Sequence, residues 1–159
     1  LCVPPDTVAP GVDLGAGSTV GAGSDLKNGV TVGENADIGQ NVTLEQSVVA
    51  GADLEVGDGT VINRDVTLGD QVSLGAGRCV AKDAEISDGV TVGDNVIIEK
   101  SAFIGADTSS GDETTVKKEA IIGANVIIGA RVIVGSAAVI ADGSSIPDDF
   151  VIPAGAVVP

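Results

Sequence analysis

Aliphatic residues recur at every sixth position along the whole chain. Of the 27 positions from 2 to 158 that are spaced by six, 24 are Val, Ile or Leu, and no insertion interrupts the series. The position two residues before each of them is mostly Ala, Val, Ser or Thr. Residues two apart in an extended chain point to the same side, so each pair predicts a short strand with one buried face.

The residues between these pairs have the composition of turns. All 23 glycines fall at one of two turn positions, either directly after the aliphatic residue or two residues after that first position. The second of these positions also carries Asn and Asp. These residue types adopt the left-handed backbone conformation at low cost. A strand of three residues and a turn of three residues, repeated without loop insertions, predict a solenoid in which each coil hydrogen-bonds to the next.

A second period sets the number of sides. In the glycine series that directly follows the aliphatic residue, non-glycine residues recur every 18 positions: Lys27, Glu45, Asn63, Ala81, Glu99 and Lys117. Three six-residue units per coil place this series along one corner of a triangular prism. Residues 1–159 are therefore expected to form a single all-β domain, a triangular solenoid of about nine coils.

Residues 121–140 have the length of a membrane-spanning helix and only one charge, Arg131. About 20 apolar residues are enough to cross a bilayer. However, the glycines at 123, 129 and 135 keep the six-residue period, which an α-helix does not produce. A charge in the middle of a span also costs about 2.5–3.5 kcal/mol. We interpret this segment as rungs of the solenoid and expect no membrane partner.

The charge balance excludes two classes of partner. With 23 acidic and 8 basic residues, the chain has a net charge of −15, whereas nucleic acids and anionic membrane surfaces require a basic footprint. The N-terminal residues lack a basic segment followed by an apolar one, so we expect a cytoplasmic location. Cys2 and Cys79 lie more than four coils apart, beyond the reach of a disulfide.

The motifs VTVGDNVII (90–98) and IIGANVIIGARVIVGSAAVI (121–140) resemble the hexapeptide-repeat superfamily. The resemblance covers essentially the whole chain and implies a left-handed parallel β-helix, a hand that periodicity alone cannot give. The superfamily includes acyltransferases, γ-class carbonic anhydrases and the C-terminal domains of sugar-nucleotide pyrophosphorylases. The motif is specific for the fold and says little about function.

The sequence offers no set of residues for catalysis. The acyltransferases of this superfamily resemble one another in using a histidine base, and its carbonic anhydrases bind zinc through histidines, but this chain has no histidine. We therefore predict no catalytic, cofactor-binding or metal-binding residues, and interpret the turn aspartates as solvated turn formers. Outward threonines would suit an ice-binding surface, but they are spread over all three sides, which disfavours that reading.

One corner concentrates the basic residues. It contains six of the eight: Lys27, Arg64, Lys82, Lys100, Lys117 and Lys118. They could form a stripe that binds anionic ligands. Because acidic residues share the corner, we favour charge compensation: Glu45, Asp65, Asp83, Glu99 and Glu119.

Outward apolar residues are the feature that the fold explains least. They gather in the C-terminal half on two adjacent sides, and the oligomer-contact candidates are Ile97, Phe103, Ile121, Ile133, Val139, Val151 and Val157. Such a patch marks an interaction site. A patch around one edge suits a threefold axis, and the resemblance also implies trimers, so we expect a homotrimer first and a dimer second.

Two functions remain open at this stage. The first is a non-catalytic assembly module, alone or as the C-terminal part of a sugar-nucleotide transferase. The second is an acyltransferase-like enzyme with an atypical base or one supplied by a partner, so whether the chain is an enzyme stays undecided. A separate expectation concerns Arg78, which occupies an inward position. Because an unpaired buried guanidinium is costly, we expect its head to turn out at the corner, toward solvent or an acid.

Overall fold

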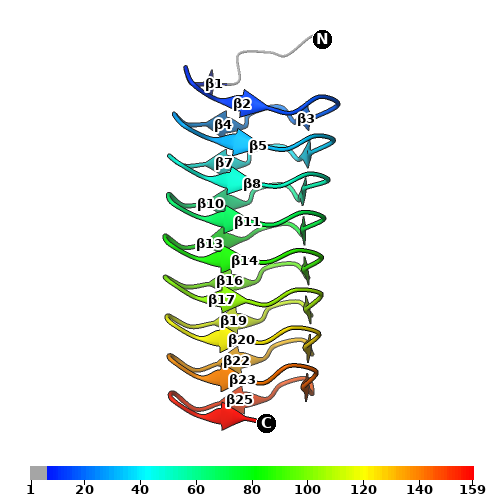
Figure 1. Cartoon of the computed structure of the whole chain (residues 1–159), viewed down its shortest axis with the longest axis vertical. Helices are drawn as coiled ribbons and strands as arrows, with labels where there is room; N and C mark the ends of the chain where they lie inside the picture. The colour runs from blue at the N-terminus through cyan, green and yellow to red at the C-terminus, as the bar shows by residue number, and fades with distance from the viewer. Residues whose placement is uncertain (1–6) are drawn as a thin grey trace.

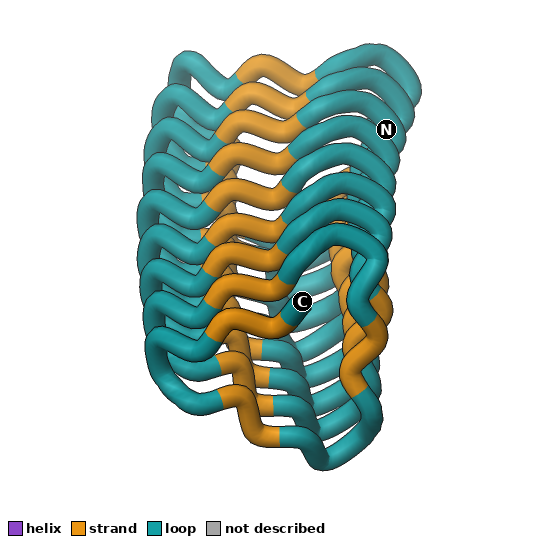
Figure 2. The backbone as a smooth tube through the Cα atoms, turned by 60° about the horizontal axis from the view of Figure 1, so that its bottom comes forward, coloured by secondary structure: helices purple, strands orange, loops and turns teal. Residues whose placement is uncertain are grey.

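The computed structural model describes residues 7–159, which form a left-handed parallel β-helix of three sheets. In Figure 1 the chain crosses the front of the molecule from left to right while it descends from the N-terminus to the C-terminus. The three sheets run side by side along the axis and enclose a triangular cross-section (Figure 2). The predicted solenoid, including its hand, is confirmed.

The sheets contain nine, nine and eight strands, and are named A, B and C in the order in which the chain visits them. Sheet A contains Thr7–Val8 (β1), Asp25–Leu26 (β4), Thr43–Leu44 (β7), Val61–Ile62 (β10), Cys79–Val80 (β13), Ile97–Ile98 (β16), Thr115–Val116 (β19), Ile133–Val134 (β22) and Val151–Ile152 (β25). Sheet B contains Asp13–Leu14 (β2), Thr31–Val32 (β5), Val49–Ala50 (β8), Thr67–Leu68 (β11), Glu85–Ile86 (β14), Phe103–Ile104 (β17), Ile121–Ile122 (β20), Val139–Ile140 (β23) and Val157–Val158 (β26). Sheet C contains Thr19–Val20 (β3), Asp37–Ile38 (β6), Glu55–Val56 (β9), Ser73–Leu74 (β12), Thr91–Val92 (β15), Ser109–Ser110 (β18), Ile127–Ile128 (β21) and Ser145–Ile146 (β24).

Every strand pairs in parallel with the strand 18 residues further along, as in Val61↔Cys79 and Cys79↔Ile97. The strands comprise two residues each, and not the three predicted. The small inward residue stands just before the strand, where its carbonyl accepts a bond from the coil above: Asp25 N donates to Val42 O over 2.8 Å. The inward position was therefore right, although the residue precedes the strand.

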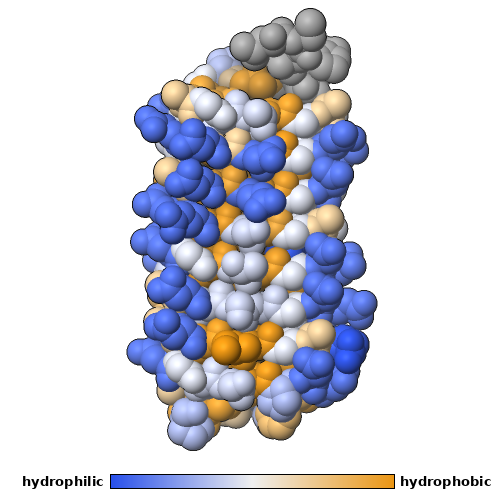
Figure 3. Space-filling view, turned by 90° about the vertical axis from the view of Figure 1, so that its right-hand side faces the viewer, coloured by the Kyte–Doolittle hydropathy of each residue, from blue (hydrophilic) through white to orange (hydrophobic). Residues whose placement is uncertain are grey.

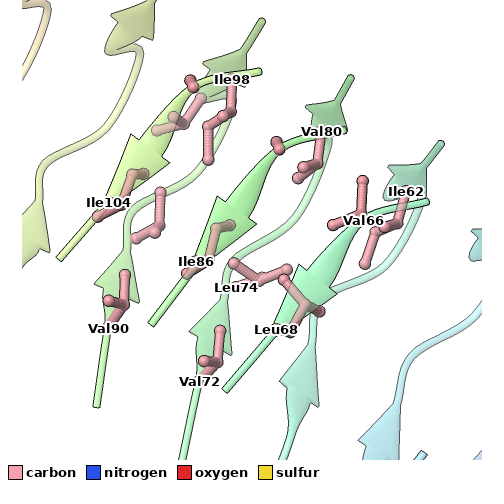
Figure 4. Packing of buried hydrophobic residues seen from close by; sticks show 14 of the residues in the cluster. Ile62, Val66, Leu68, Val72, Leu74, Val80, Ile86, Val90, Ile98 and Ile104 are labelled. Carbon is pink, nitrogen blue, oxygen red and sulfur yellow. The ribbon is translucent and has the colours of Figure 1, made fainter. Parts of the chain in front are cut away.

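The interior is a stack of aliphatic side chains, one layer per coil. Leu44, Ile62, Ile98 and Ile122 are fully buried, and the side chains of successive strands point into the same central space (Figure 4). This repetitive packing forms the core almost without aromatic residues, since the chain has two phenylalanines and no Tyr or Trp. Hydrophobic burial along the axis is the main stabilising term.

Glycine is favoured at the two turn positions for different physical reasons. The later position has a positive φ at all 25 turns from 11 to 155, of which nine are glycine and sixteen are other residues, such as Asn35 at 57°. The earlier position lies against the next coil. A Cβ on Gly105 would approach the carbonyl carbon of Gly123 to 2.5 Å, so this position needs the missing side chain and not a special φ.

Inward hydroxyl groups are bonded across coils. Ser24 Oγ donates to Gly39 O over 2.9 Å, and Thr60 and Thr114 make the same bond to the glycine carbonyl 15 residues further on. Each buried hydroxyl thereby satisfies a carbonyl at the turn of the next coil. This bonding explains why Ser and Thr are tolerated, besides Ala and Val, at these buried positions.

Arg78 differs from the prediction. It is 3% exposed, and Nη2 donates to Val92 O, which also accepts from Gly75 N. Its Nε and Nη1 have no partner among the described residues. Burial lowers the pKa of Arg78 to about 10, while Asp94 and Asp112 act in the opposite direction. The expectation that its head reaches solvent was wrong, because the side chain stays buried and its Nη2 bonds to Val92 O of the next coil.

Cys79 is exposed and free, and Cys2 lies outside the described residues.

Candidate functional site: an apolar edge of the prism

Sheet B presents an unbroken column of outward apolar side chains. Phe103, Ile121, Val139 and Val157 occupy four successive strands in register. Ile121 is 48% exposed and Val157 72%, whereas Phe103 and Val139 are partly buried. The column begins below Glu85, its register partner on the preceding strand. The four sequence-predicted residues of this side therefore lie together.

Sheet A carries the other three predicted residues. Ile133 and Val151 are in register, while Thr115 separates Ile133 from Ile97. Ile97, Ile133 and Val151 are 47%, 37% and 57% exposed. The apolar column is therefore continuous in the last two strands of sheet A and interrupted one coil above them.

The two columns flank the same corner, the A–B corner, which is the row of turns leading from each strand of sheet A to the next strand of sheet B. In the upper coils this corner is charged, with Glu99 and Lys100 between Ile97 and Phe103. In the last two coils the turns are Gly135–Ser136–Ala137 and Pro153–Ala154–Gly155. The apolar surface is therefore uninterrupted by charge only around the lower end of the corner. We call residues 133–139 and 151–157 the lower A–B edge.

Acidic neighbours offset basic charges at the upper A–B corner. Lys82 Nζ lies 3.9 Å from Asp65 and 3.8 Å from Asp83, and the Glu99 carboxylate accepts from the backbone N–H of Lys118 over 3.1 Å. Lys27 is hydrogen-bonded to Asp25, which raises the pKa of Lys27. Among the described residues, acidic side chains therefore offset the charges of Lys82 and Lys27, whereas the Glu99 bond goes to the backbone of Lys118 and not to its ammonium group.

The third side differs from the other two. Figure 3 looks onto sheet C, where hydrophilic side chains line both flanking corners and the most prominent hydrophobic cluster stands in the lower part. Ile127, 60% exposed, is the large apolar outward residue of this sheet, between Ser109 and Ser145 in register. Val49 on sheet B, 46% exposed, is similarly isolated between Thr31 and Thr67. Single exposed apolar residues of this kind are ordinary on protein surfaces.

The aspartates of the other two corners have a structural role that the sequence analysis missed. Their carboxylates accept from backbone N–H groups in the coil above, as Asp70 does from Ala52 over 2.8 Å and Asp94 from Ala76 over 2.8 Å. The group comprises Asp58, Asp70, Asp88, Asp94, Asp112, Asp142 and Asp148. They are bonded, and not merely solvated, turn formers. The signal was their fixed place as the middle residue of the turn.

A bidentate ion pair joins two coils at the C–A corner. Arg131 Nε and Nη2 donate to the Asp149 carboxylate over 2.6 and 2.9 Å. This hydrogen bonding raises the pKa of Arg131 and lowers that of Asp149. Both side chains are largely exposed, so the pair adds little stability.

Residues 7–159 contain no group of three or more His, Cys, Asp and Glu placed to hold a metal ion. Within the same residues, no helix is long and apolar enough to cross a membrane. The expected cytoplasmic location stays a prediction.

Solved structures similar to this chain include acyltransferases. A UDP-N-acetylglucosamine O-acyltransferase from Moraxella catarrhalis RH4 superposes with a TM-score of 0.62 at 12% identity, over 98% of this chain and 66% of that one. A proposed acetyltransferase from Bacillus cereus gives a TM-score of 0.51 at 19% identity, over 92% of this chain and 71% of that one. At these identities the likeness shows the fold alone. The chain spans slightly less than two thirds of the first protein's length.

No curated protein sequence matches the chain. A family model described as the hexapeptide repeat of succinyl-transferase matches residues 65–99, 96–128 and 118–159. These matches cover residues 65–159, which is more than half of the chain. The chain therefore belongs to the hexapeptide-repeat family.

Proposed function

We propose that this β-helix is a non-catalytic assembly module that forms a homotrimer through the outward apolar residues of sheets A and B, centred on the lower A–B edge. It would act alone or as the C-terminal part of a sugar-nucleotide transferase. The observation that carries the proposal is the apolar surface that turns the A–B corner without a charge, from Ile133 to Val139 and from Val151 to Val157. Water-exposed apolar surface of this extent is unfavourable unless a partner covers it.

A threefold axis suits the shape of this surface. A patch that wraps one edge gives each rod two sides to offer to two neighbours, and a closed ring leaves no copy with an uncovered patch. A twofold dimer would need one self-complementary face, so it is the second choice. The polar sheet C and the coils above Ile97 would stay in contact with solvent.

The test is a double substitution in the sheet B column, Ile121→Asp with Val139→Asp. Both side chains point away from the core and are neighbours in register. Light scattering should show a trimer for the unchanged protein and a monomer for the variant, because carboxylates cannot be buried in an apolar contact without partners. Circular dichroism should keep the β signal.

The matched control is Ser109→Asp with Ile127→Asp, which adds the same two charges to register neighbours on sheet C. This variant should remain a trimer. A monomeric unchanged protein at micromolar concentration, or a double variant that stays trimeric, would contradict the proposed assembly.

The alternative is an acyltransferase-like enzyme whose base is atypical or comes from a partner chain. The matching family model and the fold shared with acyltransferases favour it. The absence of histidine from the sequence opposes an independent site. The purified chain should give no acetyl transfer from acetyl-coenzyme A to sugars or amines and no hydration of carbon dioxide. Acetyl transfer at about 1 per second would establish the alternative, and hydration of carbon dioxide at that rate would contradict the non-catalytic role.

A further inference from the structure

The last coil differs from all coils above it in its prolines. Pro147, Pro153 and Pro159 each stand directly after the last strand of one sheet, β24 in sheet C, β25 in sheet A and β26 in sheet B. Among the described residues, the remaining proline is Pro10, which lies one position later in its turn. The same chemical change thus occurs once in each sheet, at its lower edge.

In the coils above, the N–H group at this position connects each coil to the next. Gly129 donates to Ile146 O over 2.8 Å, Gly135 to Ile152 O over 2.8 Å and Ala141 to Val158 O over 2.9 Å. The next residue in each of these three columns is a proline, which has no N–H to donate. The lower edge therefore lacks this donor in all three sheets.

Pro147 also occupies space that a further coil would need. Every described residue above it in its column, from Gly21 to Gly129, is glycine. A Cβ on Gly129 would lie 2.3 Å from the Asp148 carboxylate, so this position is tight where another coil follows. A pyrrolidine ring at 147 would project into the corresponding space below the last coil. The column above Pro153 accepts side chains such as Lys117, so Pro153 opposes a further coil through the missing donor alone.

The edge would otherwise be open to pairing. A second set of N–H groups also donates to the next coil, as Ile133 N does to Phe150 O over 3.0 Å. At the lower edge the corresponding N–H groups are those of Ser145, Val151 and Val157. A bare strand edge is a template for another chain, and proline is one of the residues that blunt such an edge.

We propose that Pro147, Pro153 and Pro159 close the lower edge of the β-helix against end-to-end addition of a second copy. Growth along the axis is opposed in every sheet at once by a lost hydrogen bond, and at Pro147 also by an occupied space. This inference rests on the hydrogen-bond ladder and is independent of the proposed lateral contact.

The experiment is the triple variant Pro147→Gly, Pro153→Gly, Pro159→Gly, which restores three N–H groups. The described coils above carry only glycine in the column of Pro147 and mostly glycine in that of Pro159. The average molar mass of this variant, measured by light scattering, should increase with time by at least about tenfold. A head-to-tail contact that does not close into a ring grows into an open filament. Electron microscopy should show rods that lengthen without widening. The unchanged protein should keep a constant mass.

The control is Pro10→Gly, which removes a proline from a different turn position and should leave the mass unchanged. A triple variant with the mass distribution of the unchanged protein would overturn the proposal, as would growth into wide or amorphous aggregates. The lateral trimer is scored separately in the same samples, because it changes the initial mass and not the growth along the axis.

Discussion

The upper and lower parts of the A–B corner are built on the same backbone but present different surfaces. Above Ile133 the turns carry charged residues such as Lys82, Lys100 and Glu119, whereas the last two turns contain only Gly, Ser, Ala and Pro. The interior is the same in both parts, since Ile62 and Ile140 are equally buried. The inward positions therefore determine how the coils pack, whereas the outward positions determine whether the surface suits solvent or a partner.

The largest expected effect is the difference between the same substitution made at an inward position and at the outward position beside it. Ile122 is fully buried, and its neighbour Ile121 is 48% exposed. Ile122→Asp should lower the free energy of unfolding by about 3–5 kcal/mol or more, because its carboxylate would be buried without a partner. Ile121→Asp should leave that free energy nearly unchanged at a concentration where the protein is monomeric. Denaturant unfolding followed by circular dichroism measures both, and equal losses would refute the division.

Gly135→Lys would give the lower corner the chemistry of the upper one. A Cβ at this position would lie 2.4 Å from Ala154 N and 2.5 Å from the Pro153 carbonyl carbon, so backbone must shift. We expect a loss of about 1–3 kcal/mol in unfolding free energy, as for other overpacked sites. The control is Ala81→Lys in the same column, where Lys27 and Lys117 already stand, and it should change stability by less than about 0.5 kcal/mol. Equal effects would mean that the two parts of the corner are equally roomy.

The upper coils also contain a costly interior residue that the lower ones lack. Arg78→Thr removes a buried guanidinium with two unpartnered nitrogens. It also places a hydroxyl where Thr60 and Thr114, one and two coils away, bond to a glycine carbonyl. We expect the variant to gain about 1–2 kcal/mol in unfolding free energy, since an unsatisfied buried polar group costs about that much. A loss of stability would show that Arg78 is fully partnered.

The pH dependence of this gain has a definite sign. Burial lowers the pKa of Arg78 to about 10 in the native state, well below its ordinary value in the unfolded chain. Between these two values the unfolded state binds the extra proton, so the stability of the unchanged protein relative to the variant rises with pH. The advantage of Arg78→Thr should therefore be complete at pH 8 and smaller at pH 11. An advantage that widens at pH 11 would contradict the lowered pKa.

The smallest effect should come from adding charge to the lower corner without steric conflict. The variant combines Ser136→Lys and Ala154→Lys, both at the middle position of the turn. The same column already carries Arg64, Lys82, Lys100 and Lys118 in the coils above. The fold should be unaffected, while trimer association weakens by about tenfold, which corresponds to about 1.4 kcal/mol. Analytical ultracentrifugation over a dilution series measures this. The reciprocal variant, Lys100→Ser with Lys118→Ser, should not weaken association.

Much of this protein could be read from its sequence because its pattern is local. The alternation of Ile121 and Ile122 predicts which side chain is buried, and the 18-residue series through Lys27 and Lys117 predicts three sides. The seven contact candidates were placed on two adjacent sheets, as expected, because an outward residue stays outward when no insertion shifts the register.

The tertiary structure decided what happens between coils. It showed that Gly105 and similar glycines are required by the approach of the next coil, that Asp70 and similar aspartates bond to the backbone of the preceding one, and that Arg78 folds back inside. These contacts join residues 14 to 19 positions apart. The order of residue types determines each strand and turn, but the stacking distance between coils determines which side chains can reach across it, and that distance exists only once the coils have formed.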